Sequence, residues 1–229
     1  MPKKLIALLL LVVLVTMPFV TYAGTFDPNH AIAYLESKFQ CGCTRGGTGA
    51  MIGRRGLITA GHNLYCHNHG AGLKYCNFYF GARGANSCWY QYSGKFTYRV
   101  YDTFSNGYNA QNDIGYVVFD GPVGDQTGWF GWMTGYDDDV NMEFMNLLNY
   151  DARRHLQNVY DVGYIRSDKL LHWRGYISGT EGGPVYISSE DRQSYVVAVY
   201  ITTDSSGNGI GRRLTSDVIN DMKAAGAFN

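Results

Sequence analysis

The 229-residue chain carries 19 Lys and Arg and 19 Asp and Glu residues, so its formal net charge is zero. This balance leaves no basic excess for a nucleic acid or an anionic membrane surface, and neither is expected as a partner. Nineteen tyrosines, 29 glycines and only five prolines combine aromatic strand formers with turn residues, which favours β structure over a helical bundle.

The amino-terminal segment has the form of a secretory signal peptide. Lys3 and Lys4 precede an apolar run over 5–15, Pro18 breaks that run, and small residues occupy positions 21 and 23 before Gly24. Retention as an anchor is the alternative, but a membrane span needs about 20 apolar residues. We therefore expect cleavage of residues 1–23, no stable membrane insertion and a secreted, extracellular protein. Without the two lysines, 17 basic residues face 19 acidic ones, a net charge of −2.

The predicted elements begin with a short helix. Asp27-Pro28 is typical of a helix cap followed by proline at the first helical position, and residues at helical spacing follow over 28–39. Thr215 or Ser216 can cap a carboxy-terminal helix that Gly226 ends. Between the helices, short apolar runs separated by glycine predict strands over 49–52, 56–59, 76–80, 88–92, 95–101, 114–119, 159–165, 184–187 and 195–202.

This order of elements predicts an all-β protein. No helical segments are expected between the strands, which argues for barrels or a sandwich and against βαβ units. No linker or internal repeat divides the chain. We expect a lead-in with the short helix over 24–46, followed by one domain over 47–229, and a monomer.

The five cysteines all lie within 48 residues. An exported chain meets an oxidising environment, in which disulfides are the default expectation. Cys76 and Cys88 flank a glycine-containing turn and are expected to pair. Cys66 is expected to pair with Cys43 or with Cys41, the first being preferred, which leaves one cysteine free.

Three motifs contain residues with candidate chemistry. His62 ends an apolar strand after Thr59-Ala60-Gly61, and Asp113 opens another apolar strand 51 residues later. A carboxylate there can accept the second N–H of the histidine and fix its tautomer. The glycine-rich turn over 179–184 can direct backbone N–H groups at an oxyanion.

In this order, the motifs resemble the trypsin-like serine endopeptidases, and within them the glutamyl-endopeptidase branch. The resemblance implies two perpendicular six-stranded β-barrels with the catalytic cleft between them. His62 then matches the general base, Asp113 its orienting acid, and the N–H groups of Gly179 and Glu181 the oxyanion hole. The likeness covers about residues 47–225 and rests on GTGAMIGRRGLITAGH at 47–62, QNDIGYVVF at 111–119, GWFGW at 128–132, GTEGGPVY at 179–186 and the final helix.

The sequence departs from this family at three positions. Glu181 occupies the place of the nucleophilic serine. Thr180 stands where trypsin has the aspartate that pairs with a freed amino terminus, so activation of that kind is not expected. Tyr200 falls where glutamyl endopeptidases have a histidine that reads acidic substrates. Tyr200 and Thr202 are assigned to the substrate pocket, which is therefore not expected to select glutamate.

Glutamate at the nucleophile position is incompatible with the usual acyl-transfer chemistry. An ionised carboxylate offers His62 no proton to abstract, and its negative charge opposes the charge that an oxyanion hole stabilises. Loss of a triad nucleophile costs about a million-fold in turnover. The first hypothesis is therefore a protease homologue without peptidase activity, which binds a peptide or protein in its inter-barrel cleft.

Two alternatives stay open. The chain is an active endopeptidase if its natural form has serine at 181 or if another group acts as nucleophile. It is a metal-binding extracellular module if His62, Cys66, His67 and His69 hold a metal. Clustered carboxylates at 137–139 suit calcium, although a lone acidic run is more often a solvated loop. The preferred interpretation assigns the chain no metal and no cofactor.

Overall fold

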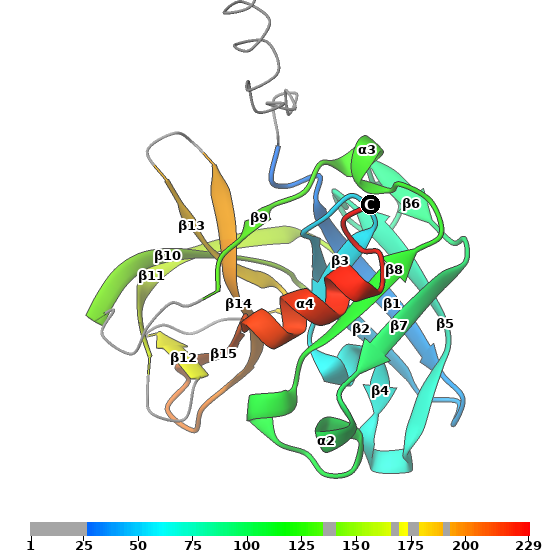
Figure 1. The fold of residues 1–229 in the computed structure, drawn as a ribbon, viewed down its shortest axis with the longest axis horizontal. Coiled ribbons are helices and arrows are strands. Elements are labelled where there is room, and N and C mark those ends of the chain that lie inside the picture. The colour runs from blue at the N-terminus through cyan, green and yellow to red at the C-terminus, as the bar shows by residue number, and fades with distance from the viewer. Residues whose placement is uncertain (1–26, 135–140, 166–169, 174–178, 190–192) are drawn as a thin grey trace, which may run out of the picture.

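The computed structural model describes residues 27–134, 141–165, 170–173, 179–189 and 193–229. The predicted signal peptide and the acidic run at 137–139 lie outside the described residues. In the described part, two sheets contain most of the chain, one built from its first half and one mainly from its second (Figure 1). None of the described helices has the length and apolar character that a bilayer crossing requires.

The first sheet contains a run of six antiparallel strands in the order β5-β1-β2-β3-β8-β7, and the short strands β4 and β6 pair with β5. The hydroxyl of Tyr98 on β7 accepts a hydrogen bond of 3.0 Å from the N–H of Leu73 on β5, so the two ends of the run meet and the sheet curls into a barrel-like form. Its strands are β1 (Ile32–Phe39), β2 (Thr44–Met51), β3 (Gly56–Thr59), β4 (Tyr65–Cys66), β5 (Ala71–Phe80), β6 (Tyr90–Tyr92), β7 (Phe96–Val100) and β8 (Gly115–Phe119).

The predicted short helix over 28–39 is wrong. Asp27 does accept a hydrogen bond of 2.9 Å from the N–H of Asn29, but the motif it forms closes a single turn and does not start a helix. The chain then extends into β1, which pairs with β2 on one side and with β5 on the other. Pairing on both sides satisfies the backbone of this segment and overrides its helical spacing. The lead-in therefore contributes an internal strand to the first sheet.

The second sheet closes on itself. Its strands follow the order β13-β10-β11-β12-β15-β14, and β13 also pairs with β14, which completes a ring of six. The short strand β9 adds to β14 in the parallel direction. Its strands are β9 (Gly131–Trp132), β10 (Asn141–Tyr150), β11 (Leu156–Ile165), β12 (Leu170–Trp173), β13 (Pro184–Ser188), β14 (Ser194–Thr203) and β15 (Gly209–Arg213).

Tyr150, the last residue of β10, connects the two sheets. Its hydroxyl accepts a hydrogen bond of 3.0 Å from the N–H of Ala82 and donates one of 3.1 Å to the carbonyl of Ile32. Its own N–H donates to the hydroxyl of Thr48 on β2 at 3.1 Å. The side chain is fully buried, and this burial raises the pKa of its phenol. The sheets therefore share a buried, hydrogen-bonded junction.

The predicted carboxy-terminal helix is confirmed as α4 (Ser216–Ala224), which runs across the front of the molecule in Figure 1. Its buried side chains belong to the same core cluster as the first sheet. The carbonyl of Ala227, just after the helix, accepts a hydrogen bond of 2.9 Å from the N–H of Arg55, and Asp221 forms an ion pair with Arg99 at 2.9 Å. The other helices are short: α2 (Asp102–Ser105), α3 (Gly124–Thr127) and the 3₁₀ turns η1 (Gly61–Asn63), η2 (His67–His69) and η3 (Ala110–Asn112).

Candidate functional site

His62 and Asp113 meet because their strands are neighbours. His62 lies in η1, directly after β3, and Asp113 directly precedes the segment that enters β8, which pairs with β3. The Nδ1 atom of His62 lies 2.7 Å from Oδ2 of Asp113, and Oδ1 accepts the backbone N–H of His62 at 3.0 Å. Asp113 is fully buried and His62 almost so. The structure therefore makes the contact that the sequence spacing predicted.

The carboxylate of Glu181 lies on the other side of the imidazole ring. Its Oε2 atom is 4.0 Å from Nε2 of His62 and 3.4 Å from a guanidinium nitrogen of Arg45 on β2. The first distance exceeds a hydrogen bond, which rarely spans more than about 3.2 Å. Among the described residues, Nε2 of His62 has no hydrogen-bond partner. Glu181 thus stands between a histidine and an arginine, with a charge-assisted hydrogen bond of 3.4 Å from the arginine and no hydrogen bond to the imidazole ring.

The turn that carries Glu181 is held by its backbone. Thr180 donates its N–H to the carbonyl of Tyr150 at 2.7 Å, and Gly182 donates its N–H to the carbonyl of Tyr200 at 2.7 Å. In the described part of the chain, the N–H groups of Gly179 and Glu181 have no acceptor. Unengaged N–H groups at these two positions are what an oxyanion hole requires. Their role there stays a prediction.

Gly182 has no substitute at its position. Its φ is +99°, and a Cβ atom there would lie 2.1 Å from the carbonyl oxygen of Thr48. Close approach of the turn to β2 lets the N–H of Thr48 donate to the carbonyl of Glu181 at 2.8 Å. The glycine of this motif therefore allows the turn to pack directly on the first sheet.

Sequence reasoning missed Asn63 and Arg45. The fully buried Asn63 donates from its side-chain amide to the hydroxyl of Thr59 at 3.0 Å and to the carbonyl of Glu181 at 2.9 Å. Its only signal in the sequence was its position directly after His62. Arg45 lies in the segment that the sequence assigned to the lead-in, and no sequence motif links it with Glu181. Its contact with Glu181 depends on the position of β2.

The two residues assigned to the substrate pocket lie on β14. Tyr200 is buried, and its ring packs against Trp173 with centroids 5.7 Å apart. Trp173 in turn covers Gly209 and Gly211 of β15. Thr202 is half-buried two residues further along the strand. Trp173 therefore fills the space beside Tyr200. The assignment of Tyr200 and Thr202 to a substrate pocket stays a prediction.

The predicted disulfides are not present, and all five cysteines are free thiols. For Cys76 and Cys88 the strand register gives the reason. Phe80 pairs with Tyr90, so Cys88 lies at the turn end of the hairpin and Cys76 four residues before Phe80, about 13 Å away along β5. A disulfide needs Cα atoms within about 7 Å, so this predicted pair is wrong. Cys76 is buried, and desolvation raises the pKa of its thiol to about 12.

The second predicted bridge joined Cys43 to Cys66. Their sulfur atoms lie within 4.8 Å of each other, in a group that also contains Cys41 and His69. A disulfide bond measures about 2.05 Å, so the two thiols are neighbours but are not bonded.

A cavity of about 410 Å³ lies elsewhere between the sheets. It is lined in part by His30 and Ala82 from the first half of the chain and by Leu148 and His155 from the second. His62, Asp113 and Glu181 do not line it. Its position therefore gives no additional support to a ligand at His62.

A curated sequence relative is the "Extracellular metalloprotease" of Bacillus subtilis (strain 168), which is 26% identical over 207 residues. The alignment covers 87% of this chain and 64% of the relative, so the chain spans less than two thirds of that protein's length. No protein-family model matches the sequence.

Solved structures resemble the chain more completely. A Glu endopeptidase in complex with MPD has a TM-score of 0.72 at 17% identity, with 90% of this chain and 94% of that one covered. The protease Anisep of Arthrobacter nicotinovorans gives 0.73 at 15% identity, with 87% and 97% covered. The thermostable serine protease AL20 from an extremophilic microorganism gives 0.74 at 13% identity, with 88% and 99% covered. With its two antiparallel sheets, the chain has the trypsin-like double-barrel fold.

Proposed function

We propose that the chain is a secreted homologue of the trypsin-like serine endopeptidases that does not cleave peptides and binds a peptide or protein at the junction of its two barrels. One observation carries the proposal. The His62–Asp113 hydrogen bond of 2.7 Å is intact, while a carboxylate of Glu181 lies 4.0 Å from the ring nitrogen that would activate a serine.

The chemistry of this arrangement opposes hydrolysis. Attack of a carboxylate on an amide would form an anhydride, from which the carboxylate leaves more readily than the amine. The charge of Glu181 also lies beside the N–H groups that would stabilise an oxyanion. Binding and the oxyanion hole alone retain only about 10³- to 10⁴-fold catalysis over water.

Arg45 supports a binding role for Glu181. Its guanidinium contacts the carboxylate at 3.4 Å, so the charge that replaced the nucleophile has a cationic partner on the first sheet. Such a pair, formed by half-exposed side chains, contributes little to stability. It does hold the carboxylate at the junction of the barrels, where it can accept a hydrogen bond from a ligand.

An exposed aromatic ring beside the site supports a peptide as ligand. Tyr108 is 58% exposed and packs against His67 and Phe104. The pKa of its phenol is raised by burial first and then by the negative charges of Asp113 and Glu181. An exposed tyrosine next to hydrogen-bonding groups is a frequent anchor for peptides.

Secretion is part of the proposal. It rests on the signal-like amino-terminal segment and on the name of the Bacillus subtilis relative, which is described as extracellular.

A fluorophosphonate probe, which labels activated serines, tests the proposal together with a casein-hydrolysis assay. The purified chain is expected to show neither labelling nor hydrolysis above background. The Glu181→Ser variant is expected to gain both, because His62 and Asp113 are already in contact, whereas the control variant Glu181→Ala gains neither. Labelling or hydrolysis by the unmodified chain would establish the alternative, an active endopeptidase.

Peptide binding is measured separately, with a pool of casein-derived peptides on the immobilised chain. Tyr108→Ala is expected to reduce capture at least several-fold. Tyr160→Ala, which removes a similarly exposed tyrosine from β11, is the control and should leave capture unchanged. Equal capture by both variants would contradict a binding role for the surface beside His62.

A further inference from the structure

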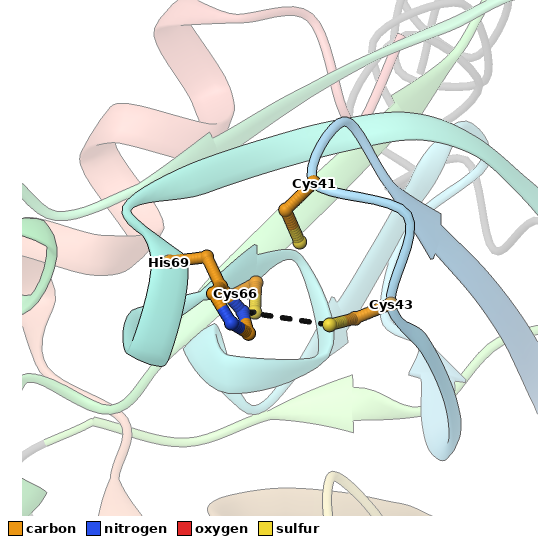
Figure 2. A group of neighbouring side chains, drawn as sticks. All are labelled: Cys41, Cys43, Cys66 and His69. Carbon is orange, nitrogen blue, oxygen red and sulfur yellow. Dashed lines mark hydrogen bonds between the residues drawn. The ribbon is translucent and has the colours of Figure 1, made fainter.

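Four potential metal ligands come together outside the His62 site. Cys41 and Cys43 lie in the turn between β1 and β2, Cys66 ends β4, and His69 ends η2. The three sulfur atoms and a ring nitrogen of His69 all lie within 4.8 Å of one another. Figure 2 shows the four side chains directed toward a common centre from two separate segments.

The distances match a tetrahedral zinc site. Nδ1 of His69 lies 3.4 Å from the sulfur of Cys43 and 3.4 Å from the sulfur of Cys66. With Zn–S bonds of about 2.3 Å and a Zn–N bond of about 2.05 Å, tetrahedral angles require about 3.6 Å between sulfur and nitrogen and about 3.8 Å between sulfurs. The two sulfur–nitrogen distances are close to this geometry, and the three sulfur atoms, within 4.8 Å of one another, are near enough to share one ion.

The backbone explains why the ligands converge. Cys41 and Cys43 are separated by Gly42, whose φ is +94° and whose N–H donates to the carbonyl of Phe39 at 3.0 Å. This tight turn brings two thiols to the same side of the chain. On the other segment, β4 pairs with the start of β5, which brings Cys66 and His69 back beside the first pair.

We propose that Cys41, Cys43, Cys66 and His69 bind one Zn²⁺ ion in a structural Cys₃His site. The ion would be held by three thiolates and by Nδ1 of His69, and its binding would release the three thiol protons to solvent. Four protein ligands leave no open position for substrate or water, so the site stabilises the fold and carries no catalysis. This assignment replaces the expectation of no metal, and it includes neither His62 nor His67.

A disulfide accounts for fewer of these contacts. It would consume two of the three thiols, and either Cys41 or Cys43 can pair with Cys66, so it would leave a thiol and an imidazole together without a role. The nitrogen of His69 lies equally far from the sulfurs of Cys43 and Cys66. A shared ion explains that placement, and it explains why the third thiol is present.

The site would connect two segments that position the residues around Glu181. Arg45 follows Cys43 by two residues, and Cys66 follows His62 by four. Zinc would therefore fix the start of β2 against the chain that leaves η1. The assignment does not depend on the proposed function, because a structural metal is compatible with an active or an inactive protease fold.

The experiment measures metal in the full chain. The chain is purified without chelator, its zinc is determined by mass spectrometry, and the metal-free chain is reduced under anaerobic conditions and titrated with Co²⁺. About one zinc per chain is expected, together with the intense visible absorption and thiolate charge-transfer bands of tetrahedral cobalt. Loss of an outer-shell partner of a metal costs about 10- to 100-fold in affinity. His69→Gln and Cys41→Ser each remove a direct ligand, so each should weaken Co²⁺ binding by more than about 100-fold.

Matched controls come from the same region. His67→Gln removes a histidine two residues away whose Nε2 contacts the carbonyl of Phe104, and Cys88→Ser removes a thiol outside the group. Both should bind Co²⁺ like the unmodified chain. If a ligand variant fails to fold, the titration of the unmodified chain still decides, since a reduced chain that yields no tetrahedral cobalt spectrum overturns the proposal. A Cys43–Cys66 or Cys41–Cys66 disulfide found by peptide mapping of the secreted protein would overturn it as well.

Discussion

The side-chain amide of Asn63 donates a hydrogen bond of 2.9 Å to the backbone carbonyl of Glu181. It joins the residue beside His62 to the residue at the nucleophile position, across 118 positions of sequence. The N–H of Thr48 donates to the same carbonyl at 2.8 Å. Both contacts are made to the backbone carbonyl of residue 181. The distance between His62 and position 181 therefore does not depend on the side chain at 181.

Asn63→Ala should lower the free energy of unfolding by about 1–3 kcal/mol, because the buried carbonyl of Glu181 and the hydroxyl of Thr59 each lose a donor. Urea denaturation followed by tyrosine and tryptophan fluorescence measures the change. The matched control is Asn106→Ala at an exposed position, which should change stability by no more than about 0.5 kcal/mol. Equal stability of the two variants would show that the Asn63 contacts contribute nothing.

The role of Asp113 in orienting His62 can be measured only in a variant that has a nucleophilic serine at position 181. In the Glu181→Ser background, Asp113→Asn should lower turnover of a peptide ester by about 10⁴-fold, because the amide favours the wrong tautomer of His62 while leaving the geometry intact. Steady-state kinetics give the ratio. A loss of less than tenfold would mean that the 2.7 Å contact is structural only.

Gly182→Ala should cost at least about 2 kcal/mol of stability, because it places a Cβ atom at a positive φ and against the carbonyl of Thr48. Gly121 offers the control, since nothing lies within 4 Å of a Cβ atom there. Gly121→Ala should change stability by no more than about 1 kcal/mol. Thermal unfolding of both variants provides the comparison. Tolerance of alanine at 182 would mean that the turn does not approach β2 as closely as described.

Cys76 gives the stability of the protein a dependence on alkaline pH. Burial raises the pKa of its thiol from 9.0 to about 12, so the folded state holds the proton more tightly than the unfolded chain. Its contribution is fully present below pH 9 and is lost as the pH rises toward 12, by up to about 1.4 kcal/mol per pH unit. Cys76→Ala should flatten that decline in denaturation curves recorded between pH 8 and 11.

The same burial should protect the Cys76 thiol from alkylation at neutral pH. In the native chain, iodoacetamide should modify the more accessible Cys88 first and leave Cys76 until the protein unfolds. Peptide mapping identifies the modified residue. Alkylation of both at equal rates would contradict the buried position of Cys76.

The contact between His62 and Asp113 followed from the sequence because each residue flanks a short, fully apolar run. Such runs predict buried strands, and here β3 and β8 became neighbours in one sheet. The helix α4 followed from its apolar face, whose residues Val218, Ile219 and Met222 are buried, although the side chain of Thr215 at its N-cap makes no capping hydrogen bond. Local pattern and tertiary structure agreed at these places.

Other elements depended on partners that the local sequence does not reveal. The strand β10 contains three asparagines, which are unfavourable in strands, and it forms because β11 and β13 pair with it on both sides. The strand β1 replaced a predicted helix for a similar reason. Pairing of Cys76 with Cys88 was wrong because it required a strand register that apolar pattern alone does not set.

The packing of α4 has a consequence for biogenesis. The first barrel is translated first, yet Arg55 and Gly56, at the start of its third strand, are covered by residues 222–228, which are translated more than 160 positions later. Until that segment emerges, one edge of the barrel core stays open to water. The first barrel therefore cannot complete its core before residues 222–228 have been synthesised.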